Sequence, residues 1–257
     1  MPYKKTPFLQ RIKRLWRICV LIVGQGRLLT RPESANQETR NRIIHDISSQ
    51  ALAILNAKLY VRTPPQTCEH NMLVVSNHVS WLDIFAIGSL CPSSFIAKKE
   101  MQSWPLLGKI ATNAGTVFID RKNRKNIDPI NTAIATSLNA GQNVCFFPEA
   151  GTSLGTGILP FKAALFESAI QANAPIQAIA LRYYDPSGQR TTVPSYANVN
   201  LVKSIWQILA MPEILITADF APPILPDSQP DQDRFALKDQ AECYIGEKVN
   251  EDAPMPV

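Results

Sequence analysis

From about residue 70 onward, short apolar runs alternate with amphipathic segments, and this alternation constrains the fold more than any other feature of the sequence. Each apolar run is long enough for a buried strand, and the segments between them have the three- and four-residue spacing of helices. The expected strands are 73–76, 95–97, 116–119, 144–147, 176–182 and 214–218, and the expected helices are 82–90, 106–112, 128–139, 161–172 and 202–210. This order predicts an α/β domain with a largely parallel central sheet flanked by helices.

The first 31 residues are strongly basic. They carry eight Lys and Arg and no acid, so the rest of the chain has 18 bases against 21 acids. Residues 8–23 show helical spacing. Their apolar stripe comprises Phe8, Leu9, Ile12, Leu15, Trp16, Cys19, Ile22 and Val23, and Arg11, Lys13, Arg14 and Arg17 fall on the other side. A basic amphipathic helix is typical of a membrane interface, so we expect residues 4–31 to bind an anionic membrane surface. The alternative is an ordinary helix packed on the domain.

A second helix is expected over about 37–59, before Thr63-Pro64-Pro65. These features predict an N-terminal helical membrane-association segment at 1–62 and an α/β domain at 63–221. Residues 222–257 are expected to form a Pro-rich linker followed by a solvated acidic helix and tail. No uncharged run near the N-terminus approaches the roughly 20 residues that span a bilayer. The five cysteines form no CxxC pair, so neither a zinc site nor a disulfide framework is expected.

The first candidate site follows the expected strand at 73–76. His78 and Asp83 are five residues apart there, and ligands of α/β sheets collect at the carboxyl ends of strands. An Asp that accepts one imidazole N–H leaves the other ring nitrogen free to remove a proton. No GxSxG segment provides a serine nucleophile, so such a base favours activation of a substrate hydroxyl. A helix-capping Asp beside a structural His is the alternative.

Two further strand ends carry polar residues. Arg121 follows the expected strand 116–119 and is suited to bidentate phosphate binding, whereas the neighbouring bases are consistent with a solvated loop. After 144–147 come Glu149 and then Gly151, Thr152 and Ser153. Small and hydroxyl residues of this kind let backbone N–H groups approach an anion.

Four segments in this order carry a family resemblance: Asn77-His78-x4-Asp83, Gly115-x2-Phe118-Ile119-x-Arg121, Phe147-Pro148-Glu149-x2-Thr152-Ser153 and Ala174-Pro175-Ile176-x-Ala178-Ile179. Their order and spacing resemble the four sequence blocks of the glycerolipid acyltransferase superfamily. The similarity covers about residues 70–185 and is strongest to bacterial 1-acyl-sn-glycerol-3-phosphate acyltransferases and lyso-ornithine-lipid acyltransferases. Three further segments are also similar to that family: Ala97-Lys98-Lys99-Glu100, Trp104-Pro105-Leu106-Leu107-Gly108 and Leu159-Pro160-Phe161-Lys162.

The resemblance implies a mechanism without a metal, another cofactor or a covalent acyl-enzyme. His78, held by Asp83, would deprotonate the free hydroxyl of a lysolipid, which would attack an acyl thioester of coenzyme A or acyl carrier protein. Arg121 and the segment Glu149–Ser153 would bind the acceptor's head group, and Asn77 would shape the loop that carries His78. The implied location is peripheral, on the cytoplasmic face of the inner membrane.

The third block departs from the family pattern, which usually reads Pro-Glu-Gly-Thr followed by Arg or Thr. A gapless alignment puts Ala150 at the Gly and Gly151 at the Thr, so a positive φ at position 150 would strain an alanine. The missing basic residue weakens the case for a phosphate acceptor and gives weight to the lyso-ornithine-lipid alternative. The resemblance still implies 1-acyl-sn-glycerol-3-phosphate as the acceptor, with phosphatidic acid as the product.

Three other classes of function remain open. A non-catalytic lipid-binding protein of the same fold would bind vesicles without acyl transfer. A thioesterase would use water in place of the lysolipid. Nucleic-acid binding through residues 4–31 is disfavoured, because the helix has an apolar stripe and no nucleic-acid motif accompanies it.

Overall fold

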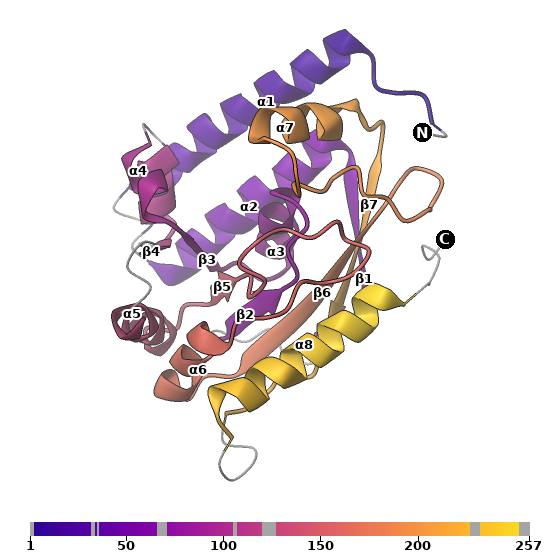
Figure 1. Cartoon of the computed structure of the whole chain (residues 1–257). Helices are drawn as coiled ribbons and strands as arrows, with labels where there is room; N and C mark the ends of the chain where they lie inside the picture. Colours follow the sequence, from indigo (N-terminus) through magenta and orange to yellow (C-terminus); the bar gives the residue numbers. More distant parts are fainter. Residues whose placement is uncertain are drawn as a thin grey trace.

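A seven-stranded sheet forms the centre of the molecule, which we describe from a computed structural model (Figure 1). The structure describes residues 3–31, 34, 36–65, 71–104, 107–119, 127–226 and 232–251. The strands are β1 (Ala57–Thr63), β2 (Leu73–Ser76), β3 (Ser94–Lys98), β4 (Val117–Ile119), β5 (Val144–Phe146), β6 (Ile176–Tyr184) and β7 (Ile214–Phe220). Their order across the sheet is β1-β7-β6-β2-β5-β3-β4, and β6–β7 is the one antiparallel pair among them. The predicted α/β fold with a largely parallel sheet is therefore confirmed.

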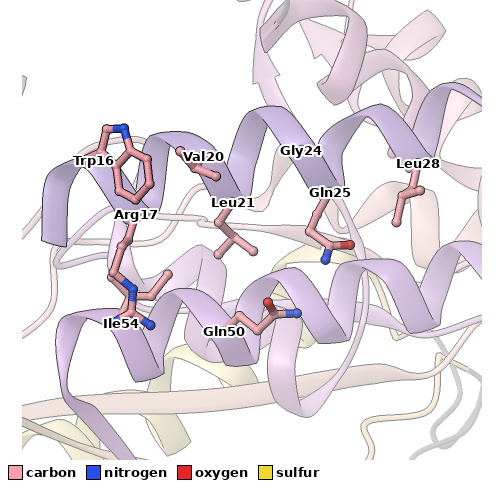
Figure 2. Close-up of a pocket in the computed structure, with 9 residues that line it drawn as sticks. All are labelled: Trp16, Arg17, Val20, Leu21, Gly24, Gln25, Leu28, Gln50 and Ile54. Carbon is pink, nitrogen blue, oxygen red and sulfur yellow. The ribbon is translucent and has the colours of Figure 1, made fainter. Parts of the chain in front are cut away.

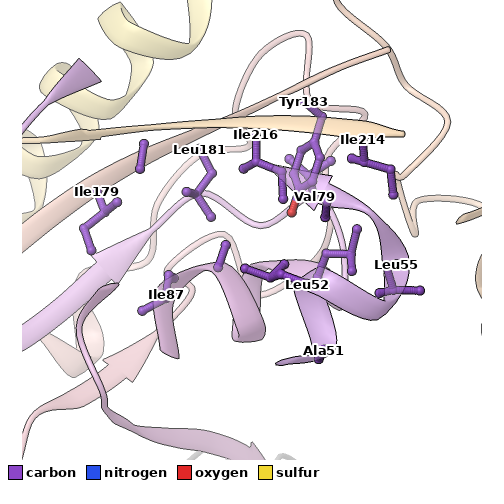
Figure 3. Packing of buried hydrophobic residues seen from close by; sticks show 14 of the residues in the cluster. Ala51, Leu52, Leu55, Val79, Ile87, Ile179, Leu181, Tyr183, Ile214 and Ile216 are labelled. Carbon is purple, nitrogen blue, oxygen red and sulfur yellow. The ribbon is translucent and has the colours of Figure 1, made fainter. Parts of the chain in front are cut away.

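Helices cover both faces of the sheet. They are α1 (Phe8–Gly26), α2 (Gln37–Leu55), α3 (Leu82–Leu90), α4 (Leu107–Asn113), α5 (Asp128–Asn139), α6 (Glu167–Ala172), α7 (Leu201–Ala210) and α8 (Arg234–Asn250). Short 3-10 turns lie at Arg27–Thr30, Lys99–Ser103 and Ala163–Leu165. One apolar core joins α1, α2, α3 and α7 to one face of the sheet, and a second joins α5, α6 and α8 to the other face. Figure 3 shows the part of the first core between α2, α3 and the strands β6 and β7.

The central strands are buried along their whole length. All nine residues of β6 and all four of β2 are buried, as expected for strands covered by helices on both faces. Successive side chains of β6 point to opposite faces, so Ile179, Leu181 and Tyr183 join the α3 core while Ala178 and Ala180 join the α8 core.

The sequence-based expectation for residues 37–59 is wrong at its C-terminal end. Helix α2 stops at Leu55 because Asn56 adopts a left-handed conformation with φ of 55°. Residues 57–63 then form β1, which pairs with β7 and lies at one edge of the sheet. The predicted domain boundary after residue 62 therefore falls within a strand of the central sheet.

The C-terminal helix is packed, not fully solvated. Leu237, Ala241, Ile245 and Val249 recur every four residues and are buried in the second core. Ahead of this helix, Ile224 pairs with Ile176 at the start of β6, so this part of the expected linker is bound to the sheet. The expected helix at 161–172 is also shorter, since α6 begins at Glu167.

Helix α1 forms where it was predicted, but one of its basic residues does not face solvent. The guanidinium of Arg14 is buried and donates hydrogen bonds to the carbonyl oxygens of Met211 (2.7 Å) and Pro212 (3.0 Å). Arg14 therefore attaches α1 to the segment between α7 and β7, and it is not available to an anionic surface. No helix in the described ranges has the length and apolar character needed to cross a membrane.

Candidate active site

The register of two neighbouring strands brings the first and third sequence blocks together. Strands β2 and β5 run parallel, with Val75 opposite Phe146. His78 and Glu149 each lie three residues beyond this pair, so both follow the carboxyl ends of adjacent strands. The backbone N–H of His78 donates to Oε1 of Glu149 across 2.7 Å.

The carboxylate of Asp83 is the most densely bonded group of the site. Its Oδ2 lies 2.8 Å from Nδ1 of His78 and accepts the backbone N–H groups of Val79 (2.8 Å) and Ser80 (2.9 Å). Its Oδ1 accepts the hydroxyl of Tyr183 at 2.5 Å. Asp83 lies in the first turn of α3. The loop that begins at His78, five residues earlier in the chain, therefore folds around the carboxylate of Asp83.

The imidazole of His78 is held on one side and open on the other. Its ring stacks on Phe147 with centroids 4.0 Å apart and an interplanar angle of 12°. The side chain of His78 is 22% exposed, whereas that of Asp83 is fully buried. A proton on Nδ1, donated to Asp83, leaves Nε2 as the basic nitrogen, which is the arrangement that a general base requires.

Glu149 joins two loops of the site. Besides the N–H of His78, its carboxylate accepts the N–H of Leu159 at Oε2 (2.8 Å). Burial raises the pKa of Glu149 to about 7, although these two N–H donors lower it. Both oxygens of Glu149 are thus occupied by backbone donors, which favours a structural role over direct contact with the acceptor.

Asn77 connects the His78 loop to the neighbouring strand β6. Its Nδ2 donates to the carbonyl of Leu181 (3.0 Å), and its Oδ1 accepts the N–H of Leu181 (2.8 Å). This side chain is fully buried. Asn77 therefore shapes the loop by mimicking a strand partner.

The hydroxyl-rich segment after Glu149 lies beside His78. The N–H of Ser153 donates to the carbonyl of His78 (2.8 Å), while Gly151 is exposed. Thr152 and Ser153 lie on the wall of a cavity of about 550 Å³. The other lining residues are Leu154, Thr156, Gly157, Ile158, Leu159, Ala197 and Asn198. This cavity has no charged side chain among its lining residues.

Arg121 lies outside the described residues, beyond the end of β4 at Ile119. Within the described ranges, no three His, Cys, Asp or Glu side chains are grouped so as to hold a metal ion.

Two side chains that contact the pair were not among the predicted site residues, namely Phe147, which stacks on His78, and Tyr183, which donates a hydrogen bond to Asp83. A buried tyrosine hydroxyl normally finds a partner, so a Tyr within a fully buried strand is the signal that identifies Tyr183.

Ala150 adopts a left-handed conformation with φ of 56°, so the condition for strain at this position of the third block is met. A Cβ in this conformation is strained, by roughly 1–2 kcal/mol. We expect Ala150→Gly to raise the free energy of unfolding by about 1 kcal/mol, measured by urea denaturation. The matched control is Ala133→Gly on the exposed face of α5, which should lower it by about 1 kcal/mol. A lower free energy of unfolding for Ala150→Gly would contradict the claim that Ala150 is strained.

The raised pKa of Glu149 predicts a pH dependence of stability. Between pH 4.5 and about 7 the folded protein binds this proton more tightly than the unfolded chain. The resulting stabilisation is complete below pH 4.5 and is lost as the pH rises through 7. Urea denaturation should show that the free energy of unfolding is lower at pH 7.5 than at pH 5.0, by on the order of 2 kcal/mol. The Glu149→Gln protein should lack this difference. Equal pH dependence in both proteins would contradict this.

A family model and individual relatives indicate the same protein family. The family model described as Acyltransferase matches residues 49–182. A 1-acyl-sn-glycerol-3-phosphate acyltransferase of Neisseria meningitidis is 48% identical over 257 residues, covering 100% of both chains. A lyso-ornithine lipid O-acyltransferase of Pseudomonas aeruginosa is 34% identical over 149 residues, covering 58% of this chain and 57% of its own.

A solved structure shares the fold. The crystal structure of the 1-acyl-sn-glycerophosphate acyltransferase PlsC from Thermotoga maritima aligns with a TM-score of 0.74 at 18% identity, covering 97% of each chain. Sequence blocks, fold and full-length similarity agree, and this chain belongs to the acyltransferase family.

Proposed function

We propose that this protein is a membrane-peripheral enzyme that transfers a fatty acyl group from a thioester of coenzyme A or acyl carrier protein to the free hydroxyl of 1-acyl-sn-glycerol-3-phosphate, forming phosphatidic acid. The observation that carries the chemistry is the His78–Asp83 pair at the carboxyl end of β2, with Nδ1 and Oδ2 2.8 Å apart. The substrate follows from the similarity to the meningococcal acyltransferase, which extends over the whole chain.

The reaction needs one base and no covalent acyl-enzyme. Nε2 of His78 takes the proton of the lysolipid hydroxyl as its oxygen attacks the thioester carbonyl carbon. The carbon–sulfur bond then breaks, and the departing thiolate takes the proton from His78 to leave as a thiol. Asp83 stabilises the imidazolium that forms in between. The products are one ester and one thiol, so the protein returns to its starting protonation state.

Lyso-ornithine lipid is the second candidate acceptor. The uncharged lining of the cavity beside Ser153 favours it, because a phosphate is usually bound by cationic side chains. The weaker and shorter similarity to lyso-ornithine lipid acyltransferases disfavours it. The two acceptors are therefore compared directly in the experiment below.

The proposed function predicts transfer that depends on His78. In mixed micelles with oleoyl-coenzyme A, we expect turnover with 1-acyl-glycerol-3-phosphate to exceed that with lyso-ornithine lipid. His78→Ala should lower kcat by roughly 10³-fold or more, because the general base is lost, while circular dichroism shows an intact fold. The exposed His45→Ala serves as the control and should leave kcat unchanged.

Near-normal transfer by a folded His78→Ala protein would overturn the mechanism. Absence of transfer with oleoyl-coenzyme A and with acyl carrier protein as donor would favour a lipid-binding protein, and release of free fatty acid without an acceptor would favour a thioesterase.

The membrane-facing part of the proposal rests on an exposed apolar ridge along α1. We define it as Phe8, Leu9, Ile12, Trp16 and Val20, which lie on consecutive turns and are exposed. Leu9 is 80% and Trp16 64% exposed. Side chains of this size exposed in a row are unusual on a soluble surface and are suited to insertion among lipids.

Helix α7 extends the same surface. It packs beside α1 (Figure 1), with Phe8 and Trp206 in edge-on contact at 5.7 Å between ring centroids. Val202 adds an exposed apolar side chain, and Lys13 and Arg17 add exposed positive charge beside the ridge. Each such base contributes on the order of 1 kcal/mol near an anionic surface.

A hollow of about 530 Å³ lies next to the ridge, between α1 and α2 (Figure 2). Trp16 and Val20 of the ridge line it together with Arg17, and α2 contributes Gln50 and Ile54. We therefore assign α1 and α2 to membrane association and the sheet with its other helices to catalysis. The proposed location is the cytoplasmic face of the inner membrane.

This assignment predicts that Trp16→Ser weakens binding to phosphatidylglycerol vesicles by about tenfold or more, since burying a large apolar side chain contributes roughly 1.5–3 kcal/mol. Co-sedimentation measures the partitioning. Phe235→Ser is the matched control, because Phe235 is similarly exposed but lies on α8, across the sheet. Equal loss in both variants, or none in either, would contradict docking through the ridge.

A further inference from the structure

The buried oxygen Oδ1 of Asp83 has a single hydrogen-bond donor in the described part of the chain. That donor is the hydroxyl of Tyr183 at 2.5 Å, whereas Oδ2 receives the His78 imidazole and two backbone N–H groups. Tyr183 comes from β6 and Asp83 from α3, so this bond joins the sheet to the helix that carries half of the catalytic pair.

The surroundings of this bond are apolar. Tyr183 is 2% exposed and belongs to the core that includes Val79, Leu181 and Ile216 (Figure 3). Burial, with a smaller effect of the adjacent Asp83 carboxylate, holds the pKa of the Tyr183 hydroxyl well above its ordinary value. The hydroxyl therefore keeps its proton and acts as a donor.

Loss of this donor would affect the reaction through Asp83. A buried carboxylate oxygen without a partner is costly, and the carboxylate would rotate or bind a proton to relieve the cost. Either change weakens the acceptor that fixes the proton on Nδ1 of His78, and Nε2 is then less often available as a base.

We infer that Tyr183 is a positioning residue of the acyl transfer, which acts by orienting the Asp83 carboxylate so that His78 keeps the tautomer with a free Nε2. This inference rests on the proposed function for its kinetic consequences, but the tautomer of His78 can be measured independently. Tyr183 touches neither substrate in this account, so its loss should change kcat and leave both KM values unchanged.

The kinetic test compares Tyr183→Phe with Tyr184→Phe. Tyr184 is the next residue of β6, fully buried and outside the α3 core, so its variant removes the same hydroxyl away from Asp83. We expect Tyr183→Phe to lower kcat about tenfold, as loss of a hydrogen bond to a charged group does, with both KM values within twofold. Tyr184→Phe should keep kcat within twofold. Equal effects of the two variants would overturn the inference.

A double-mutant cycle tests whether Tyr183 acts through Asp83. In an Asp83→Asn background, Tyr183→Phe should cause no further loss of kcat beyond twofold. A further tenfold loss would show that Tyr183 acts on the fold in general and would overturn the inference.

The spectroscopic test uses ¹⁵N-labelled histidine, with His78 assigned from the resonances that disappear in His78→Ala. The unmodified protein should show protonated Nδ1 and bare Nε2, and Tyr183→Phe should show a larger population of the other tautomer. Identical nitrogen shifts in both proteins would overturn the inference. This readout decides the role of Tyr183 even if no acyl transfer is found.

If Tyr183→Phe does not fold, 3-fluorotyrosine placed at position 183 keeps the ring and the hydroxyl. Fluorine makes the phenol a stronger donor to Oδ1, which draws negative charge away from the His78 contact. The Nδ1 proton resonance of His78 should move upfield, and the same substitution at position 184 should leave it in place. An unchanged resonance with 3-fluorotyrosine at position 183 would overturn the inference.

Discussion

The buried carboxylate of Asp83 is the group on which the rest of this site depends. It has no exposure to water, and its charge is balanced entirely by hydrogen-bond donors. The imidazole of His78, the N–H groups of Val79 and Ser80 and the hydroxyl of Tyr183 all converge on it. An uncompensated charge in such a place would cost several kcal/mol, so these contacts hold the loop, the first turn of α3 and the end of β6 in one arrangement.

The central sheet fixes the relative positions of the site residues. Strands β2, β5 and β6 are adjacent, and each contributes one loop or strand end to the site. The parallel register of β2 and β5 sets His78 beside Glu149, and Asn77 ties the same loop to β6 by two hydrogen bonds. The His78–Asp83 pair is thus held by elements of the central sheet and its helices, while the exposed ridge belongs to α1, which packs on the same face of the sheet as α3.

Much of the fold was predictable because each buried strand of the sheet corresponds to a short apolar run in the sequence. Helix α5 has its predicted bounds, and His78 and Asp83 were identified by their position after such a run. Strand β1 was not identified, because Lys58, Tyr60 and Arg62 interrupt its apolar pattern at the edge of the sheet. The buried face of α8 was not predicted, because the acidic composition of this segment is typical of a solvated helix although its apolar residues recur every four positions.

Long-range contacts account for most of what the sequence did not predict at the site. Nothing in the local pattern shows that Arg14 reaches the carbonyls before β7, or that Tyr183 meets a residue 100 positions earlier in the chain. The family resemblance implied a head-group role for Glu149, and the sequence did not predict that its two oxygens accept the backbone N–H groups of His78 and Leu159. The sequence left the sign of φ at Ala150 open, and the structure shows a positive φ there.

The most direct test of this account is the kcat of Asp83→Asn in acyl transfer, measured with the folded state verified by circular dichroism. Asparagine has the same shape as aspartate but carries no charge, so the imidazolium that forms on His78 during transfer loses the anion that stabilises it. The account predicts a loss of about 10³–10⁴-fold in kcat with little change in KM, of the order seen when the carboxylate of a catalytic triad is replaced by an amide. A folded Asp83→Asn protein that retains kcat within tenfold of the unmodified enzyme would contradict it.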